Sequence, residues 1–200
     1  MNKFSRFRER EIERRNEKGF TLIELLIVVA IVAILAVTVI LTINPAELLR
    51  QARDSSRISD FSTIKTALAL YLTDVGTPSL GTSGACYMSA TSTSANCGFS
   101  GTYTATSGVV ANAAKVDGTG WIPVNFNAVS AGSPMGSLPQ DPTNVSPYVY
   151  RYVASTTNLT FKLLVPLEST KYTTGAGSST PANDGGASST AYETGTALSL

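Results

Sequence analysis

The sequence has no histidine, and its 200 residues include only two cysteines and one tryptophan. Histidine is the commonest general base and metal ligand, so its absence excludes a Ser–His–Asp triad and the usual zinc sites. The phosphate-binding string Gly-x-x-x-x-Gly-Lys-Ser/Thr is absent as well. We therefore expect no enzymatic activity and no resident cofactor.

Charged residues are also scarce, at 14% of the sequence, and they are unevenly placed. Residues 1–19 hold seven basic and four acidic side chains, whereas residues 20–200 hold eight basic and ten acidic ones. The larger part therefore has no basic excess that would attract a phosphate backbone. Binding to nucleic acid is not expected.

What the sequence does have is a long apolar run from Phe20 to Ile43, interrupted only by three threonines and Glu24. As a helix it would reach ~36 Å, more than the ~30 Å hydrocarbon core of a bilayer. The run is too long for the apolar part of a cleaved secretory signal, and no small-x-small site precedes Asn44. Basic residues precede it and none follows until Arg50. This pattern predicts a retained transmembrane helix with its N-terminus in the cytoplasm.

Glu24 is the one charged residue in this run. A lone carboxylate at the bilayer centre costs about 2.5–3.5 kcal/mol on insertion scales, and less near an end of the helix. One interpretation is that Glu24 reaches the headgroups. The other is that it awaits a cationic partner inside an assembly. Cleavage after Gly19 would create such a partner, the free amine of Phe20, at the same membrane depth.

The string KGFTLIELLIVVAIVAILA resembles the processing site and helix start of type IV prepilins and type II secretion pseudopilins. A charged leader ends in glycine and is followed by phenylalanine, Thr21-Leu22-Ile23, Glu24 and an unbroken aliphatic helix. The resemblance implies that a prepilin peptidase cleaves between Gly19 and Phe20 and that Phe20 becomes N-methylated. It also implies that Glu24 neutralises the N-terminal amine, commonly that of a neighbouring subunit, so that subunits out of register leave buried charges unmatched.

A second helical pattern follows Asn44-Pro45, where we expect proline to kink the helix or briefly melt it. The charged residues here lie mostly between the apolar positions and are expected to face water or other subunits. Gly76 and the proline after it should end the helix, giving one long bent helix of roughly 80 Å from Phe20 to about Asp74. The expected packing stripe consists of Leu48, Ala52, Phe61, Ile64, Leu68, Tyr71 and Val75.

Cys86 and Cys97 bracket a polar segment within a stretch rich in Gly, Ser, Thr and Ala. Without histidine or further cysteines they are not a zinc site, so a buried free pair and a disulfide remain. An exported domain favours the disulfide. It would close a loop of about 12 residues and stabilise the fold by roughly 3 kcal/mol on the chain-entropy model.

The strongest β-strand pattern is PYVYRYVASTTNLTFKLLVPLES, in which two alternating runs flank the turn Thr156-Thr157-Asn158 and predict a hairpin. We assign its tyrosines to sheet packing rather than to a stacking platform for nucleic acid or sugar. GWIPVNF is a shorter strand candidate anchored by Trp121, and AYETGTALSL is another.

The run GSLPQDPTNVSPYVYRY resembles the Leu-Pro-x-Asp-Pro-x-Asn segment of major pseudopilins and some related pilins. Some major pseudopilins bind calcium in the C-terminal part. Asp141 and Asn144 offer suitable oxygens, but two side chains are too few for Ca²⁺, which takes about six to eight. We therefore prefer turn capping, with calcium near Asp141 and Asn144 as the alternative.

These features predict an α+β pilin fold, in which a long bent N-terminal helix, transmembrane and then amphipathic, packs on a small antiparallel β-sheet. The expected parts are a cleaved leader at 1–19, a transmembrane and assembly half of the helix at 20–44, and an amphipathic half at 45–75. The rest, 76–200, is a β-rich head with the cysteine loop and a Gly/Ser/Thr-rich C-terminal segment.

The resemblance implies a structural subunit of a type IV pilus or pilus-like filament. The implied partners are copies of the chain, other pilin-like subunits, the prepilin peptidase and the inner-membrane assembly platform. The protein would begin as a single-pass cytoplasmic membrane protein and end in an extracellular or periplasmic filament. A type II secretion pseudopilin is the alternative within this class. The alternative outside it is a monomeric membrane-anchored extracytoplasmic binding domain, which needs no acid at position 24.

Overall fold

The computed structural model describes residues 19–90, 97–99, 103–106, 113–173 and 180–200. The chain divides into two compact units, residues 1–44 and residues 45–200. The predicted leader, apart from Gly19, lies outside the described residues, as do most of the segment between the cysteines and part of the Gly/Ser/Thr-rich stretch.

The described part of the first unit is the helix α1, Leu22–Ile43. Its large apolar side chains point in all directions, and each of them from Leu22 to Ile40 is at least 51% exposed. The helix ends at Asn44, whose backbone is left-handed at φ 46° and ψ 76°. Asparagine tolerates this conformation better than most residues, so the sequence ends the helix here without a glycine.

The second unit begins with the helix α2, Pro45–Asp74. Proline suits the first position of a helix because an N–H group there has no acceptor within the helix, so proline's lack of an N–H loses no hydrogen bond. The predicted interruption at Asn44-Pro45 therefore appears as the end of one helix and the start of another. Phe61, Ile64 and Leu68 of the predicted stripe are fully buried, but Leu48 and Ala52 in the first turns are exposed.

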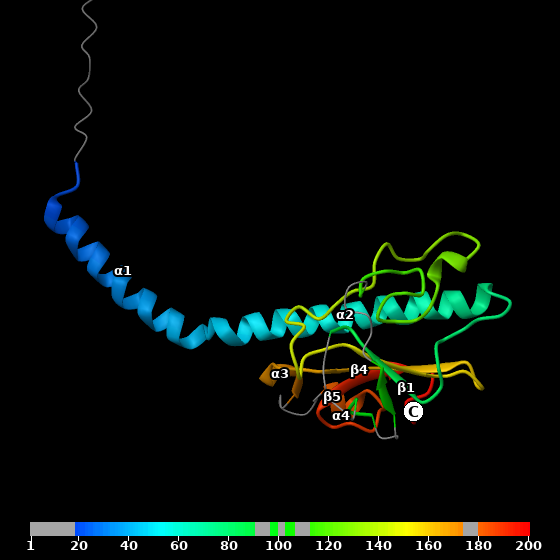
Figure 1. Cartoon of the computed structure of the whole chain (residues 1–200). Coiled ribbons are helices and arrows are strands. Elements are labelled where there is room, and N and C mark those ends of the chain that lie inside the picture. Colours follow the sequence, from blue (N-terminus) through cyan, green and yellow to red (C-terminus); the bar gives the residue numbers. More distant parts are fainter. Residues whose placement is uncertain (1–18, 91–96, 100–102, 107–112, 174–179) are drawn as a thin grey trace, which may run out of the picture. The chain divides into compact units, whose positions relative to one another are not determined.

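A five-stranded sheet packs against α2 in the order β2-β1-β3-β4-β5 (Figure 1). The predicted hairpin and the last strand candidate are present in it. The strands are β1 Ala85–Met88, β2 Thr104–Thr106, β3 Arg151–Ser155, β4 Thr160–Pro166 and β5 Ala191–Gly195.

Two expectations for the sheet were wrong. The sheet is mixed rather than antiparallel, because β1 and β2 run parallel. Parallel neighbours need a connection of a dozen or more residues, and the segment 89–103 provides one. The predicted strand around Trp121 is instead irregular chain followed by the 3₁₀ helix η2, Phe126–Ala128. Pro123 has no N–H to offer a sheet, which accounts for this difference.

Both faces of the sheet are buried. On one face, Tyr150, Tyr152 and Phe161 pack against α2, with Trp121 and Phe126 from the loop beside it. The other face carries alternating residues, including Cys86, Val153 and Leu164, and Cys97 and Phe99 pack against them. The two short helices α3, Thr170–Thr173, and α4, Thr180–Asn183, follow β4 (Figure 1).

Two of the three tyrosines of the hairpin sequence, Tyr150 and Tyr152, serve packing, whereas Tyr148 is half-buried. Tyr150 and Tyr152 are fully buried. The Tyr150 hydroxyl donates to Asp60 Oδ2 at 2.6 Å, and that of Tyr152 donates to the Leu80 carbonyl at 3.0 Å. Their rings are not available to stack on a ligand.

Candidate functional site

The start of α1 is closed by a capping box between Thr21 and Glu24. Thr21 Oγ1 accepts a hydrogen bond from the Glu24 amide at 3.2 Å. In return, Glu24 Oε2 accepts from the Thr21 amide and the Thr21 hydroxyl, each at 3.0 Å. The arrangement satisfies backbone donors that a helix otherwise leaves open, which is costly in an apolar surrounding.

This cap is a role for Glu24 that sequence reasoning missed. The signal was present, since Thr-x-x-Glu directly before an apolar run is the sequence pattern of a capping box. Both bonds to the carboxylate use Oε2. Oε1 thus has no hydrogen-bond partner among residues 19–44, so a cation can approach Glu24 while the cap stays in place.

Beyond the cap, α1 has the properties of a membrane span by length and composition. The segment Leu22–Ile40 has a mean hydropathy of 3.1, and none of its residues is buried within the chain. Gly19 and Phe20, the predicted cleavage pair, precede the helix and are exposed.

A second polar centre lies in the head, where α2 carries a buried arginine. Arg57 was expected on the water face, but it and Asp54 are fully buried. Its guanidinium donates to Asp141 Oδ2 at 2.6 Å, to Asp54 Oδ1 at 2.7 Å and to Glu168 Oε1 at 2.7 Å. The expectation failed because the partners at positions 141 and 168 are distant in sequence, and only the fold brings them to the helix.

The charges at this centre reinforce one another. Burial opposes the charge on Arg57, but hydrogen bonds to Asp141 and Glu168 outweigh it and raise the pKa of Arg57. Hydrogen bonds from Arg53, together with those from Arg57, lower the pKa of Glu168 to about 2 despite its burial. Burial alone would raise the pKa of Asp141, yet the Arg57 guanidinium holds it below its usual value.

Asp141 and Asn144 do not fit a calcium ion. Both oxygens of Asp141 accept from Arg57, and Oδ1 also caps the turn by accepting from the amides of Thr143 and Asn144. Asn144 Oδ1 accepts from the Ser89 hydroxyl at 2.9 Å. A divalent cation here would face a guanidinium at hydrogen-bond distance. Among the described residues, no group of three or more His, Cys, Asp or Glu side chains is placed to hold a metal.

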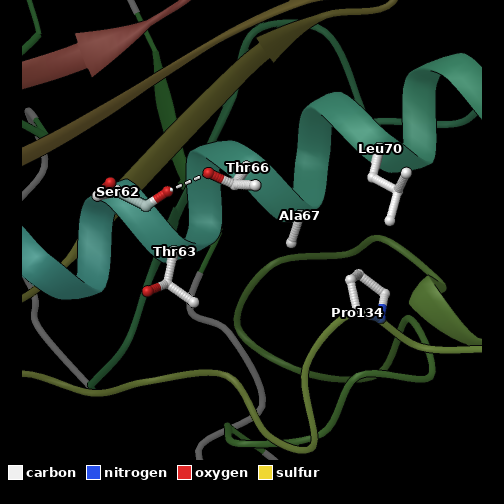
Figure 2. Close-up of a pocket in the computed structure, with 6 residues that line it drawn as sticks. All are labelled: Ser62, Thr63, Thr66, Ala67, Leu70 and Pro134. Atoms are coloured by element: carbon white, nitrogen blue, oxygen red, sulfur yellow. Dashed lines mark hydrogen bonds between the residues drawn. The ribbon is translucent and has the colours of Figure 1, made fainter.

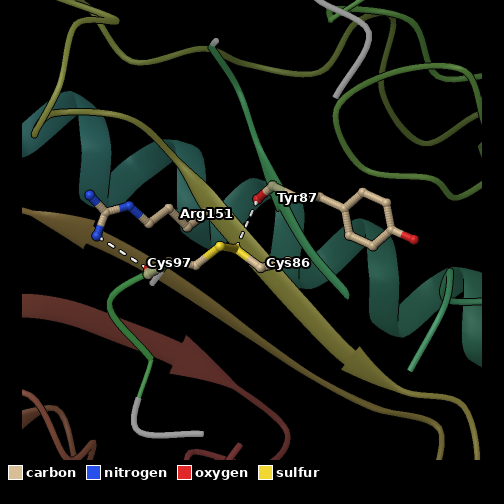
Figure 3. Close-up of a disulfide and its surroundings, with 4 residues drawn as sticks. All are labelled: Cys86, Tyr87, Cys97 and Arg151. Carbon is tan, nitrogen blue, oxygen red and sulfur yellow. Dashed lines mark hydrogen bonds between the residues drawn. A yellow bond between two sulfur atoms is a disulfide. The ribbon is translucent and has the colours of Figure 1, made fainter. Parts of the chain in front are cut away.

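Cys86 and Cys97 form a disulfide on the sheet face turned away from α2 (Figure 3). Their Cα atoms are 6.3 Å apart, within the usual range for such a bond. Arg151 lies beside it and donates to the Cys97 carbonyl at 3.3 Å and to the Pro147 carbonyl at 3.2 Å. Burial lowers the pKa of Arg151. The disulfide ties Cys97, with Phe99 close after it, to this face of the sheet.

The outer surface of α2 has a hollow of about 260 Å³ between the helix and the loop that carries Pro134 (Figure 2). Its wall consists of small hydroxyl and apolar side chains, and the Thr66 hydroxyl donates to the Ser62 carbonyl of the same helix at 2.9 Å. The lining has no titratable group, so it offers contact area rather than chemistry. The lining residues are Ser62, Thr63, Thr66, Ala67, Leu70 and Pro134.

Comparison with known families finds the prokaryotic N-terminal methylation motif at residues 14–40. This is the prepilin-type motif of type IV pilins and pseudopilins, and it covers the capped start of α1 and most of the apolar helix. No curated protein and no solved structure matches the chain. The chain thus carries the prepilin-type motif on a helix with the properties of a membrane anchor.

Proposed function

We propose that the chain is a structural subunit of a type IV pilus or pilus-like filament and that it polymerises through its N-terminal helix. The observation that carries the proposal is the methylation motif at residues 14–40, placed on an apolar helix whose large side chains are exposed on every side. Cleavage falls between Gly19 and Phe20 by a prepilin peptidase, and Phe20 is then N-methylated.

The exposed apolar side chains of α1 must be covered by something outside the single chain. Each Leu, Ile or Val side chain left in water forgoes about 1.5–3 kcal/mol, so the helix requires lipid before assembly and neighbouring helices afterwards. Lipid tails are as apolar as these side chains, so the hydrophobic effect cannot select a partner within the membrane. A specific polar contact has to set the register.

Glu24 supplies that contact. Its Oε2 closes the helix start, and its Oε1 is open to the amine of Phe20 from a neighbouring subunit. In a dry bundle an ion pair is weakly screened and an unpaired charge is heavily penalised. A subunit that docks out of register would leave both charges unmatched, so the pair selects one register.

In this proposal the basic leader stays in the cytoplasm and the head lies outside before assembly, following the positive-inside rule. The mature filament is extracellular or periplasmic. The partners are copies of the chain, other pilin-like subunits and the inner-membrane assembly platform. A type II secretion pseudopilin shares the motif and is the alternative. We place the pilus subunit first because the Ser- and Thr-rich loop and tail of the sequence suit a surface-exposed filament.

The first experiment is mass spectrometry of the N-terminus of the protein purified from its native membrane. A chain that starts at Phe20 and carries one additional methyl group supports the proposal. A chain that keeps its leader contradicts it and favours a monomeric membrane-anchored binding domain.

Substitutions at the capping box then separate the two roles of Glu24. Glu24→Gln keeps a residue that suits the box but removes the charge, whereas Thr21→Ala removes the cap and keeps the charge. If the ion pair sets the register, Glu24→Gln and Glu24→Ala both abolish filaments, and Thr21→Ala weakens assembly less. Normal filaments with Glu24→Gln would contradict the ion pair, and a loss of filaments in Thr21→Ala would then point to the cap instead.

A further inference from the structure

The helix α2 is held to the head by two different kinds of contact along its length. Residues 45–60 are all described, and the only fully buried side chains among them belong to Asp54 and Arg57. From Phe61 onward the buried side chains are apolar, and they belong to the core between α2 and the sheet. The first half is therefore fastened by charges and hydrogen bonds, and the second half by the hydrophobic effect.

Most of the polar contacts of the first half come from three consecutive residues that follow β4, Glu168–Thr170, here called the clasp. The amide and the hydroxyl of Thr170 donate to Glu47 Oε1 at 2.6 and 2.7 Å. The amides of Glu168 and Ser169 donate to the Asp54 carboxylate at 3.1 and 2.8 Å. Positions about two turns apart on α2 thus meet one short segment.

The side chain of Glu168 completes the clasp. It accepts from Arg53 Nε and Nη2, each at 2.7 Å, and from Arg57 Nη1 at 2.7 Å. Asp141 holds the other side of the Arg57 guanidinium. Because these groups share partners, removing one charge weakens the bonds of the groups that remain.

Apolar packing behaves differently from such a network. It is non-directional and is spread over many small contacts, so the core half of α2 does not depend on any one polar pair. No apolar side chain is fully buried among residues 45–60, so the hydrophobic effect contributes little to holding the first half of α2. Within the head, the clasp is therefore the main attachment of residues 47–57.

We propose that residues 47–57 of α2 and the clasp form a fastening that opens as one unit while Phe61–Asp74 stays packed on the sheet. This inference concerns the head alone and stands apart from the filament proposal. A released helical segment gains about 2 Å of reach per residue when it extends. If the chain does form filaments, opening of the clasp increases the number of residues that can extend between the apolar helix α1 and the core of the head.

The test is amide hydrogen exchange, read by mass spectrometry, on the unassembled full chain in detergent micelles. The variant is Glu168→Gln, which removes the charge shared by the two arginines and keeps the side chain's shape. Lys65→Gln is the matched control, because it removes an exposed charge of α2 outside the clasp. We expect exchange in residues 47–57 to rise at least about tenfold in Glu168→Gln, with exchange in residues 61–74 the same as in the control.

An equal rise in both halves would overturn the proposal, since α2 would then open as one unit with the core. No rise in residues 47–57 beyond the control would overturn it as well. If Glu168→Gln does not fold, the unaltered chain answers the question through exchange at increasing, sub-denaturing urea. Residues 47–57 are then expected to exchange at least about tenfold faster than residues 61–74, and equal rates would refute the fastening. Both readouts use unassembled chains, so they are independent of whether filaments form.

Discussion

The two long helices differ in what covers their apolar side chains. The large apolar side chains of α1 from Leu22 to Ile40 are each at least 51% exposed, whereas the buried apolar residues of α2 are at most 4% exposed. A helix that is apolar all round needs lipid or other helices to cover it. The apolar stripe of an amphipathic helix can be buried by the rest of its own chain. Substitutions in α2 should therefore change the stability of the single chain, and substitutions in α1 should change what it does with other molecules.

The head offers a convenient probe of this comparison. Trp121 is the only tryptophan of the sequence and is fully buried in the core of the head. Its indole Nε1 donates to the Pro139 carbonyl at 2.9 Å. Tryptophan fluorescence during urea unfolding in detergent therefore reports on the head and not on α1.

The largest loss of head stability is expected from Arg57→Met. The substitution keeps apolar bulk but leaves Asp54, Asp141 and Glu168 without the cation that they share. Breaking a buried ion pair from one side typically costs about 3–5 kcal/mol of unfolding free energy. Arg50→Met is the control, because Arg50 is half exposed and its only described ion pair is 3.8 Å long. A loss no larger than that of the control would mean that the charges at Arg57 are not desolvated.

Removal of the disulfide should have a somewhat smaller effect. The bond joins Cys86 to Cys97 over a sequence separation of 11 and ties Cys97 to the sheet face turned away from α2. On the chain-entropy model, Cys86→Ser with Cys97→Ser should cost about 3 kcal/mol of unfolding free energy. The tryptophan signal in urea measures it, and reduction of the unaltered chain provides the comparison. A double variant as stable as the oxidised protein would show that the loop packs without its cross-link.

Acid should weaken the head through the same cluster that holds the first half of α2. The pKa of Glu168 is about 2 in the folded state, and that of Asp141 is lowered as well. A lowered pKa contributes stability above the unfolded value of about 4.3 for Glu, and this contribution is lost as the pH falls toward the folded value. Asp60 acts in the opposite direction, because burial raises its pKa.

We therefore expect the unfolding free energy of the head to fall between about pH 4.5 and pH 2, and to fall less steeply in Glu168→Gln. The measurement is urea unfolding at a series of pH values, with Lys65→Gln as the matched control. Identical pH dependence in Glu168→Gln and the unaltered chain would contradict the assignment of this acid sensitivity to Glu168.

The parts of the fold that could be predicted from the sequence are those that depend on residues close together in the chain. The apolar run, the break at Asn44-Pro45, the hairpin around Thr156-Thr157-Asn158 and the last strand each follow from residues within a short window. Periodicity and turn chemistry act over such windows, so a single sequence displays them. The stripe of α2 was right from Phe61 onward for the same reason.

The missed features depend on contacts between distant residues. Arg57 is buried because positions 141 and 168 come to it, and nothing near Arg57 in the sequence shows this. The parallel pairing of β1 and β2 likewise depends on the path of the chain between them. The cap formed by Thr21 and Glu24 is an exception, since its Thr-x-x-Glu pattern is local and readable.

The smallest effect on the head is expected from Glu24→Ala. Glu24 and Trp121 belong to different compact units, and the described hydrogen bonds of the Glu24 side chain all go to Thr21. Substitutions that share no partners act independently, so the urea midpoint of the tryptophan signal should not move. The same substitution should abolish filaments if the proposed ion pair is correct. A shifted midpoint would show that α1 contributes to the head of the single chain, and the contrast between the two helices would then be wrong.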